Sequence, residues 1–156
     1  MSWFKRVTDG IRTETKDKKP TPDGLWYKCK QCKTPTSTKE FELNLFVCPH
    51  CNHHERIGSK EYFALLFDEG KFKELDANLS SGDPLKFKDT KAYPDRVKAS
   101  KSKSGLTDAV RTGVGKINGL KVSMAVMDFA FIGGSMGSVV GEKIARAIDK
   151  AIELKV

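Results

Sequence analysis

Residues 109–129 read AVRTGVGKINGLKVSMAVMDF, two β-prone runs joined by the dipeptide Asn118-Gly119. Asn-Gly readily adopts the positive φ that a type I′ turn requires at both central positions. The flanking runs, 109–117 and 120–129, are rich in the β-branched and apolar side chains that strands prefer. The stretch therefore predicts a β-hairpin, and the rest of the fold can be built outward from it.

A glycine-rich loop, FIGGSMGSVVG at 131–141, follows the hairpin and leads into a helix. The helix is predicted by apolar residues at helical spacing, namely Val140, Ile144, Ala147, Ile148 and Ala151. The order strand, strand, loop, helix predicts a ββα unit of an α/β domain. The loop matches neither the dinucleotide-binding pattern nor the P-loop pattern, so by itself it fits a packed turn as well as a ligand loop.

Two helices are expected before the hairpin, in a charged segment. Ser59 precedes the apolar-rich stretch KEYFALLFDE and Gly70 follows it, which is typical of a helix with an N-cap and a C-terminal stop. Pro94 suits the first turn of a second helix that continues to residue 103, and Gly105 ends it. The segment 58–105 is therefore expected to be a helical connector.

All four cysteines lie between residues 25 and 57 and form two CxxC pairs. They are Cys29, Cys32, Cys48 and Cys51. Each pair can form a knuckle that points two sulfurs at one position, and two knuckles complete a closed tetrahedral site for one zinc ion. The intervening segment 33–47 is long enough for two short strands, which predicts a zinc ribbon. A closed site leaves no position for water, so the zinc is expected to be structural.

The three histidines, His50, His53 and His54, lie in the same segment. Four sulfurs already fill a tetrahedron, so we expect these side chains to lie on the surface or in packing contacts rather than on the metal. Since all three belong to the ribbon, none is expected in a catalytic triad.

The composition excludes several classes of protein. The chain has 156 residues, with 28 Lys and Arg against 20 Asp and Glu and a formal charge of +8. No apolar run approaches the roughly 20 residues that span a bilayer. No apolar region of about 7–15 residues follows the basic N-terminus, so a secretory signal is not expected and the cytoplasm is the expected compartment. Residues 1–24 are interpreted as a tail and linker.

Basic residues concentrate in the segment 86–103, where Asp89 and Asp95 are the acidic ones. They are Lys86, Lys88, Lys91, Arg96, Lys98, Lys101 and Lys103. A solvated helix face accounts for part of this pattern, and a polyanionic partner, either nucleic acid or a nucleotide, is the other explanation. Because a zinc ribbon beside a basic segment is typical of nucleic-acid-binding proteins, a nucleic-acid-binding or regulatory protein is the alternative function.

Three motifs in order carry a resemblance to a known family. LWYKCKQCKT…KEFELNLFVCPHCNHHERI is followed by DPLKFKDTKAYPDRVKASKSKSGLTDAV and then by MDFAFIGGSMGSVVGEKIARAID. Together they resemble the β subunits of bacterial acetyl-CoA carboxylase carboxyltransferases, from Trp3 onward. The zinc knuckles distinguish this family from propionyl-CoA carboxylase β chains, which are similar only from about Asp83 onward.

The resemblance implies a transferase that moves a carboxyl group from biotin on its carrier protein to acetyl-CoA, which yields malonyl-CoA for fatty acid biosynthesis. It implies that residues 58–156 are the N-terminal part of a crotonase-like catalytic domain. It also implies that the four cysteines are zinc ligands. The implied partners are an α subunit, the biotin carboxyl carrier protein and biotin carboxylase. The β subunit is expected to form the CoA side of the active site. We therefore assign the wall of the acetyl-CoA site to Gly133, Gly134, Ser135, Met136 and Gly137.

The chain departs from the family at its C-terminus. Members of the family continue to a Ser-Gly-Gly-Ala-Arg motif whose glycine amides are expected to form the oxyanion hole. The sequence ends at Val156, before such a motif, so no catalytic residue is assigned. We expect the chain to be the N-terminal portion of the subunit and to be inactive alone.

Overall fold

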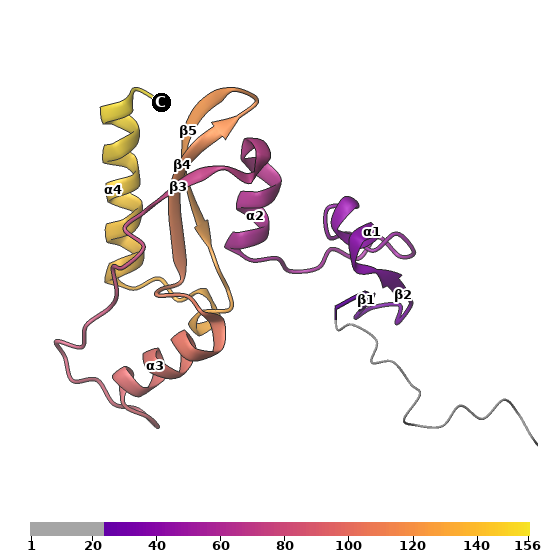
Figure 1. The fold of residues 1–156 in the computed structure, drawn as a ribbon. Coiled ribbons are helices and arrows are strands. Elements are labelled where there is room, and N and C mark those ends of the chain that lie inside the picture. Colours follow the sequence, from indigo (N-terminus) through magenta and orange to yellow (C-terminus); the bar gives the residue numbers. More distant parts are fainter. Residues whose placement is uncertain (1–23) are drawn as a thin grey trace, which may run out of the picture. The chain divides into compact units, whose positions relative to one another are not determined.

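The computed structural model describes residues 24–156, which form parts of two compact units that divide between His54 and Glu55 (Figure 1). The tail and linker expected at 1–24 lie outside the described residues, except for Gly24. Each unit has its own packed side chains and is described by itself.

The first unit is a small ribbon built from a hairpin and a helix. Strand β1, Trp26–Lys28, pairs antiparallel with strand β2, Pro35–Ser37. Helix α1, Thr38–Leu43, follows directly. An isolated bridge between Val47 and His54 closes the second half of the unit.

The two strands expected between residues 33 and 47 are one strand and one helix, so this part of the prediction is wrong. Ser37 is the N-cap of α1, since its Oγ accepts the N–H of Glu40 at 3.2 Å. The helix also buries Phe41, whose ring stacks on Tyr27 with centroids 3.8 Å apart. A local cap and an aromatic contact therefore favour the helix over a second strand.

The second unit is built on a three-stranded antiparallel sheet with the order β3-β4-β5. These strands are Phe72–Leu75, Val110–Ile117 and Leu120–Met127. The predicted hairpin is confirmed, with Asn118 at φ 51° and Gly119 at φ 80° in the turn. The two turn amides donate to the carboxylate of Asp68, each at 2.8 Å.

Strand β3 corrects the expectation of a helical connector over 58–105. Its residue Phe72 pairs with Gly115, and Leu75 pairs with Thr112. A strand of four residues carries little local signal, and its pairing partner lies far along the chain. The segment therefore belongs to the sheet rather than linking two other parts.

Helices cover both faces of this sheet. Helix α2, Ser59–Leu66, and helix α4, Ser138–Leu154, contact β4 and β5 from opposite sides (Figure 1). Helix α3, Tyr93–Ser104, contacts a short 3₁₀ turn, η3, formed by Ile132–Gly134. The order β4, β5, glycine loop, α4 is the ββα unit expected from the sequence.

The expected helix ends are mostly confirmed, with one shift. Pro94 lies in the first turn of α3, and Gly105 ends that helix with φ 71°. Helix α2 starts at Ser59 itself, so Gly58 and not Ser59 is the N-cap residue. It ends at Leu66, and Gly70 closes the following 3₁₀ turn, η2, with φ 64°.

The core of the second unit lies where α3, α4 and the sheet meet. Its buried members are Val97, Ala109, Val110, Phe131 and Val140. Lys143 of α4 is also buried and donates from Nζ to the carbonyl of Val110 at 3.2 Å, which ties the helix to β4. Burial lowers the pKa of the Lys143 ammonium group.

The apolar stripe predicted on α4 is only partly covered. Val140 and Ala147 are buried, Ile144 and Ala151 are half-buried, and Ile148 is 55% exposed. Within residues 24–156, none of the helices combines the length and apolar character needed to cross a bilayer.

Candidate metal centre and glycine loop

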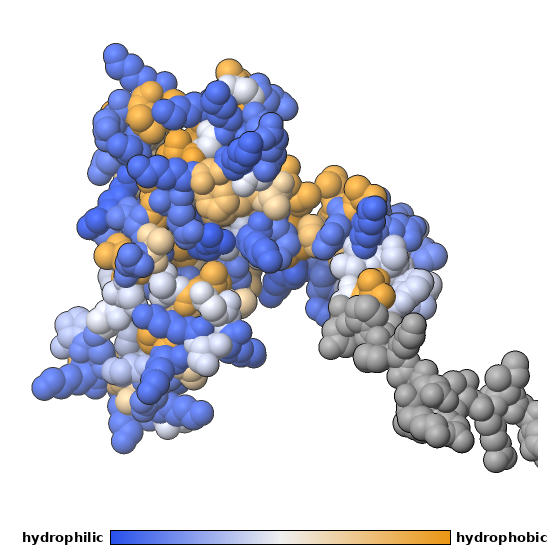
Figure 2. All heavy atoms as spheres, in the orientation of Figure 1, coloured by the Kyte–Doolittle hydropathy of each residue, from blue (hydrophilic) through white to orange (hydrophobic). Residues whose placement is uncertain are grey.

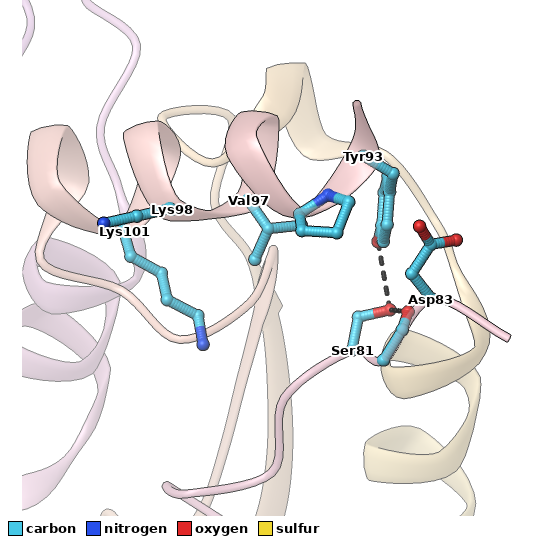
Figure 3. A pocket seen from close by; sticks show the side chains of 8 residues that line it. Ser81, Asp83, Tyr93, Val97, Lys98 and Lys101 are labelled. Atoms are coloured by element: carbon cyan, nitrogen blue, oxygen red, sulfur yellow. Dashed lines mark hydrogen bonds between the residues drawn. The ribbon is translucent and has the colours of Figure 1, made fainter. Parts of the chain in front are cut away.

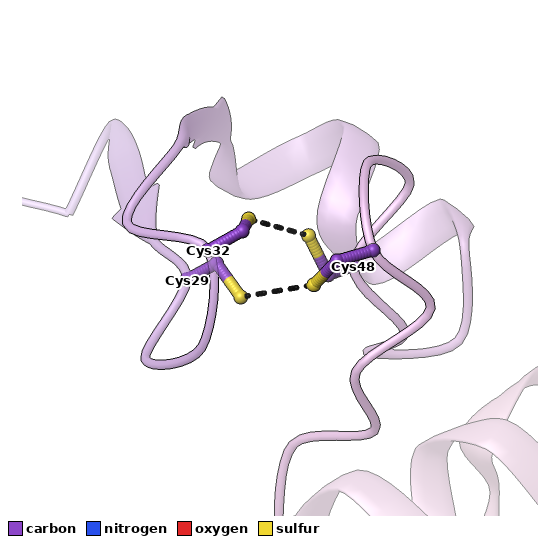
Figure 4. Close-up of side chains that lie close together, drawn as sticks. Cys29, Cys32 and Cys48 are labelled. Atoms are coloured by element: carbon purple, nitrogen blue, oxygen red, sulfur yellow. Dashed lines mark hydrogen bonds between the residues drawn. The ribbon is translucent and has the colours of Figure 1, made fainter.

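The four cysteines come together at one point of the ribbon (Figure 4). Their sulfur atoms all lie within 4.8 Å of one another. The Sγ atoms of Cys29 and Cys51, and likewise those of Cys32 and Cys48, are 3.7 Å apart. A tetrahedron with Zn–S bonds of about 2.3 Å has edges of about 3.8 Å, so the spacing fits a zinc ion coordinated by all four sulfurs.

The two knuckles are copies of one turn. In the first, the N–H of Lys33 donates to the carbonyl of Cys29 at 3.0 Å; in the second, the N–H of Asn52 donates to that of Cys48 at 2.9 Å. Both donors have a left-handed backbone, with φ of 63° for Lys33 and 56° for Asn52. The same local geometry therefore presents each pair of sulfurs to the centre.

The pKa values of two of the thiols are shifted in opposite directions. The side chain and backbone of Thr34 donate to Cys32 and lower the pKa of its thiol to about 6. The backbone N–H of His53 lowers the pKa of Cys51, but burial and the three neighbouring thiols raise it to about 12. A bound cation stabilises the thiolate form of cysteine, so a cation is the natural partner of this cluster.

The metal-ligand prediction agrees with this geometry. The cluster found among residues 24–156 consists of the four cysteines and includes no histidine. His50 and His54 are exposed, and His53 is half-buried. Because four sulfurs complete the tetrahedron, the centre can stabilise the ribbon but offers no open position for substrate.

The residues assigned to the acetyl-CoA wall lie together between β5 and α4. Gly133 and Gly134 have φ of 66° and 77°, which favours glycine at both positions. The amides of Gly134 and Ser135 are used within the turn, where they donate to the carbonyls of Phe131 and Ile132. The side chain of Met136 is 79% exposed, so the loop presents an open surface.

Asp128 anchors the start of this loop, and sequence reasoning missed it. Its Oδ2 accepts the N–H of Ser59 at 2.9 Å and the hydroxyl at 3.0 Å, while its Oδ1 accepts the N–H of Ala130 at 3.0 Å. Burial raises the pKa of this carboxyl, but these hydrogen bonds outweigh burial and hold it below its ordinary value. The carboxylate therefore joins the start of α2 to the end of β5.

The basic segment 86–103 has the character of a solvated surface. Arg96 forms two hydrogen bonds to the carboxylate of Asp89, at 2.6 and 2.5 Å. Lys98 and Lys103 are exposed, and hydrophilic side chains cover much of the face shown around α3 (Figure 2).

Two family models match the chain, one in each of its two units. The model described as "Acetyl-CoA carboxylase zinc finger domain" matches residues 26–51, and the one described as "Carboxyl transferase domain" matches residues 64–156.

Several curated proteins are similar over the whole chain. A protein of Pedobacter heparinus is 55% identical over 156 residues, which is all of this chain and 56% of the relative. A protein of Chlorobaculum tepidum is 54% identical over 154 residues, 99% of this chain and 55% of the relative. Both are named acetyl-coenzyme A carboxylase carboxyl transferase subunit beta. The chain thus spans about 56% of the length of the first of these relatives.

Proposed function

Because the chain belongs to the carboxyl transferase domain family, whose model matches residues 64–156, we propose that it acts as part of the β subunit of an acetyl-CoA carboxylase carboxyltransferase. The observation that carries this proposal is the 55% identity along all 156 residues to a protein of that name. Both units support the proposal, because the zinc finger model matches the ribbon and the carboxyl transferase model matches the second unit.

The proposed reaction transfers a carboxyl group from carboxybiotin, on its carrier protein, to the methyl carbon of acetyl-CoA. Loss of CO2 from carboxybiotin leaves a basic biotin nitrogen, which takes a methyl proton and so forms the enolate of the thioester. The enolate carbon then attacks CO2 and gives malonyl-CoA, a precursor of fatty acids. The negative charge that develops on the thioester oxygen needs fixed backbone N–H donors rather than a nucleophilic side chain.

Within this chain, we assign the glycine loop, residues 133–137, to the wall of the acetyl-CoA site. Its exposed surface and its glycines support the assignment, because side chains there would obstruct the approach of a thioester. The anchor at Asp128 would hold the loop in position. We propose an α subunit as the partner that supplies the biotin side.

The enzyme is favoured over the alternative of a nucleic-acid-binding or regulatory protein. The description of the zinc finger model itself names acetyl-CoA carboxylase, so a ribbon beside a basic segment needs no separate function to explain it. Binding of the ribbon to nucleic acid stays a prediction.

A chimera tests the proposed function. Residues 1–156 would replace the matching 56% of the Pedobacter heparinus relative, and malonyl-CoA formation would be measured with an α subunit and carboxybiotin carrier protein. We expect turnover that requires the α subunit, and the unmodified relative is the positive control. A chimera that folds, binds zinc and assembles with the α subunit but makes no malonyl-CoA would contradict the proposal.

The same chimera tests the glycine loop. We expect Met136→Glu to raise the KM for acetyl-CoA without changing the thermal midpoint, since this exposed side chain would place a carboxylate beside an anionic substrate. Leu120→Glu is the matched control, because Leu120 is similarly exposed, at 72%, but is the first residue of β5, next to the hairpin turn. If both variants have the same KM for acetyl-CoA, the assignment of the glycine loop to the substrate site is wrong.

A further inference from the structure

The segment 56–59, which leads into helix α2, lies against the residues that follow β5, and we call this segment the strap. Ser59 donates to Asp128 Oδ2 from its amide at 2.9 Å and from its hydroxyl at 3.0 Å. Gly58 lies so close to the same carboxylate that a Cβ built on it would be 2.6 Å from Oδ2. The C-terminal half of the strap is therefore fixed at the start of the glycine loop.

Arg56 attaches the other half of the strap to the next residue, Phe129. Its guanidinium group lies over the Phe129 ring, 4.6 Å from the centroid, which is within reach of a cation–π contact. Among residues 24–156, no hydrogen bond or ion pair engages this guanidinium group, so the ring is its partner. The Phe129 side chain is 50% exposed, and Arg56 covers one of its faces.

The ring of Phe129 in turn lies directly on the glycine loop. A Cβ built on Gly134 would be 3.0 Å from Cδ1 of this ring and 3.2 Å from Cε1. The position of the ring therefore limits where the backbone of Gly134 can lie. Arg56, Phe129 and Gly134 form a continuous series of contacts from the strap to the loop.

The loop needs such support because its backbone is strained. Ile132, at its start, has φ 43°, a left-handed conformation that a β-branched residue rarely adopts. Its N–H donates to the Ser100 hydroxyl of α3 at 3.2 Å, which holds this residue in place. Strained conformations persist only where the surroundings enforce them, so each contact with the loop affects its conformation.

Helix α3 is a fixed support for the start of the loop. The hydroxyl of Tyr93 donates to Ser81 Oγ at 3.0 Å, across a pocket of about 360 Å³ (Figure 3). The charged residues that line this pocket are Lys98, Lys101 and Asp83. Because α3 is held in this way, the part of the loop nearest to Phe129 depends on a different support, the strap.

We propose that Arg56 is a positioning residue for the glycine loop, because it holds the Phe129 ring against Gly134. It keeps residues 133–137 in the conformation that receives acetyl-CoA and does not itself need to touch the substrate. The proposal rests on the proposed function, in which these residues form the wall of the acetyl-CoA site. Loss of the contact lowers the fraction of molecules in the competent conformation, and the apparent affinity for substrate falls with that fraction.

Turnover by the chimera described above tests this role. We expect Arg56→Gln to raise the KM for acetyl-CoA about two- to fivefold with kcat unchanged, which is the size of one exposed cation–π contact. Lys60→Gln is the matched control, since it removes the same charge from an exposed side chain four residues further along. A KM for Arg56→Gln equal to that of Lys60→Gln would overturn the proposal.

A double-mutant cycle tests whether Arg56 acts through Phe129. Phe129→Leu removes the ring, and we expect it to raise the KM by at least as much as Arg56→Gln does. In the Phe129→Leu background, Arg56→Gln should then cause no further change. If Arg56→Gln raises the KM by the same factor in both backgrounds, Arg56 acts independently of the ring and the proposal is wrong.

Amide NMR of the zinc-loaded 156-residue chain separates this proposal from the proposed function. We expect Arg56→Gln, but not Lys60→Gln, to shift the resonance of Gly134. An unshifted resonance in Arg56→Gln, together with malonyl-CoA formation by the chimera, would retain the function and reject the positioning role. A shifted resonance, together with a chimera that assembles but makes no malonyl-CoA, would retain the effect of Arg56 on the loop and reject the function.

Discussion

Gly115 in the middle of β4 shows how one residue without a side chain allows a core to form. A Cβ built there would lie 2.4 Å from Cδ1 of Phe67 and 2.9 Å from the carbonyl oxygen of Lys71. Phe67 is buried, and its ring stacks on Phe72 with centroids 5.4 Å apart. The glycine therefore lets an aromatic ring approach the backbone of the sheet.

We expect Gly115→Ala to lower the free energy of unfolding by about 2–3 kcal/mol, because neither the ring nor the carbonyl can withdraw without repacking the core. Urea denaturation measures the change. Gly141→Ala is the matched control: Gly141 lies in α4 with open space around it, so alanine there should stabilise by about 0.5–1 kcal/mol. Equal midpoints for the two variants would show that β4 tolerates the added methyl group.

Asp128 makes a second test at the residue scale. Asp128→Ala removes acceptors from the Ser59 and Ala130 amides and from the Ser59 hydroxyl, so it should cost about 2–3 kcal/mol of unfolding free energy. Ser59→Ala removes only the hydroxyl contact and should cost about 1 kcal/mol. A smaller loss for Asp128→Ala than for Ser59→Ala, measured in urea, would reject its role as an anchor.

At the scale of elements, strands β3 and β4 are joined by an ion pair as well as by their backbones. Arg111 donates from two guanidinium nitrogens to the Glu74 carboxylate, at 2.9 and 2.5 Å. The guanidinium group also lies over the rings of Phe63 and Phe72. Hydrogen bonds from Arg111 hold the pKa of Glu74 below its ordinary value of 4.5.

This shift predicts how stability changes in acid. A carboxylate whose pKa is lower in the folded state contributes stability above its unfolded pKa and loses it as pH falls through the folded pKa. Stability should therefore fall as the pH drops below 4.5, the ordinary value for Glu74. Urea midpoints between about pH 7 and about pH 3 measure this loss. Glu74→Gln should lessen the dependence, and an identical acid slope in that variant would assign the loss to other carboxyl groups.

The elements also show where local sequence signals suffice. The Asn118-Gly119 turn and the capped helix α3 were predicted because each is specified by residues within a few positions. Strand β3 was missed because it forms only by pairing with β4. The strand expected in place of α1 was wrong because spacing between cysteines limits length but does not choose between strand and helix.

At the scale of the whole molecule, the two units are held by different forces. Few apolar side chains are buried among the described residues of the ribbon, so we expect it to depend on the four sulfurs, whereas the second unit has its own cluster of buried apolar residues. Structural zinc sites contribute roughly 10–16 kcal/mol of apparent binding free energy to small domains.

We expect chelation of zinc to unfold the ribbon and to leave the second unit folded. Amide NMR spectra recorded before and after addition of a chelator measure the two units separately. Metal analysis should find one zinc per chain in the wild type and in His50→Ala, and none in Cys48→Ala. Loss of both units on chelation, or loss of zinc from His50→Ala, would contradict this division.

The sequence by itself determined that the four cysteines form one cluster, and it determined the β4-β5 hairpin, the position of the glycine loop and the family, because each is encoded by residues at short, fixed spacing. Only the tertiary structure decided that β3 completes the sheet, that Asp128 anchors the loop through Ser59, and that Lys98, Lys101 and Asp83 line one pocket. These contacts join segments that are distant in the chain. They form when apolar burial brings the segments together, and no local pattern specifies which polar groups will then meet.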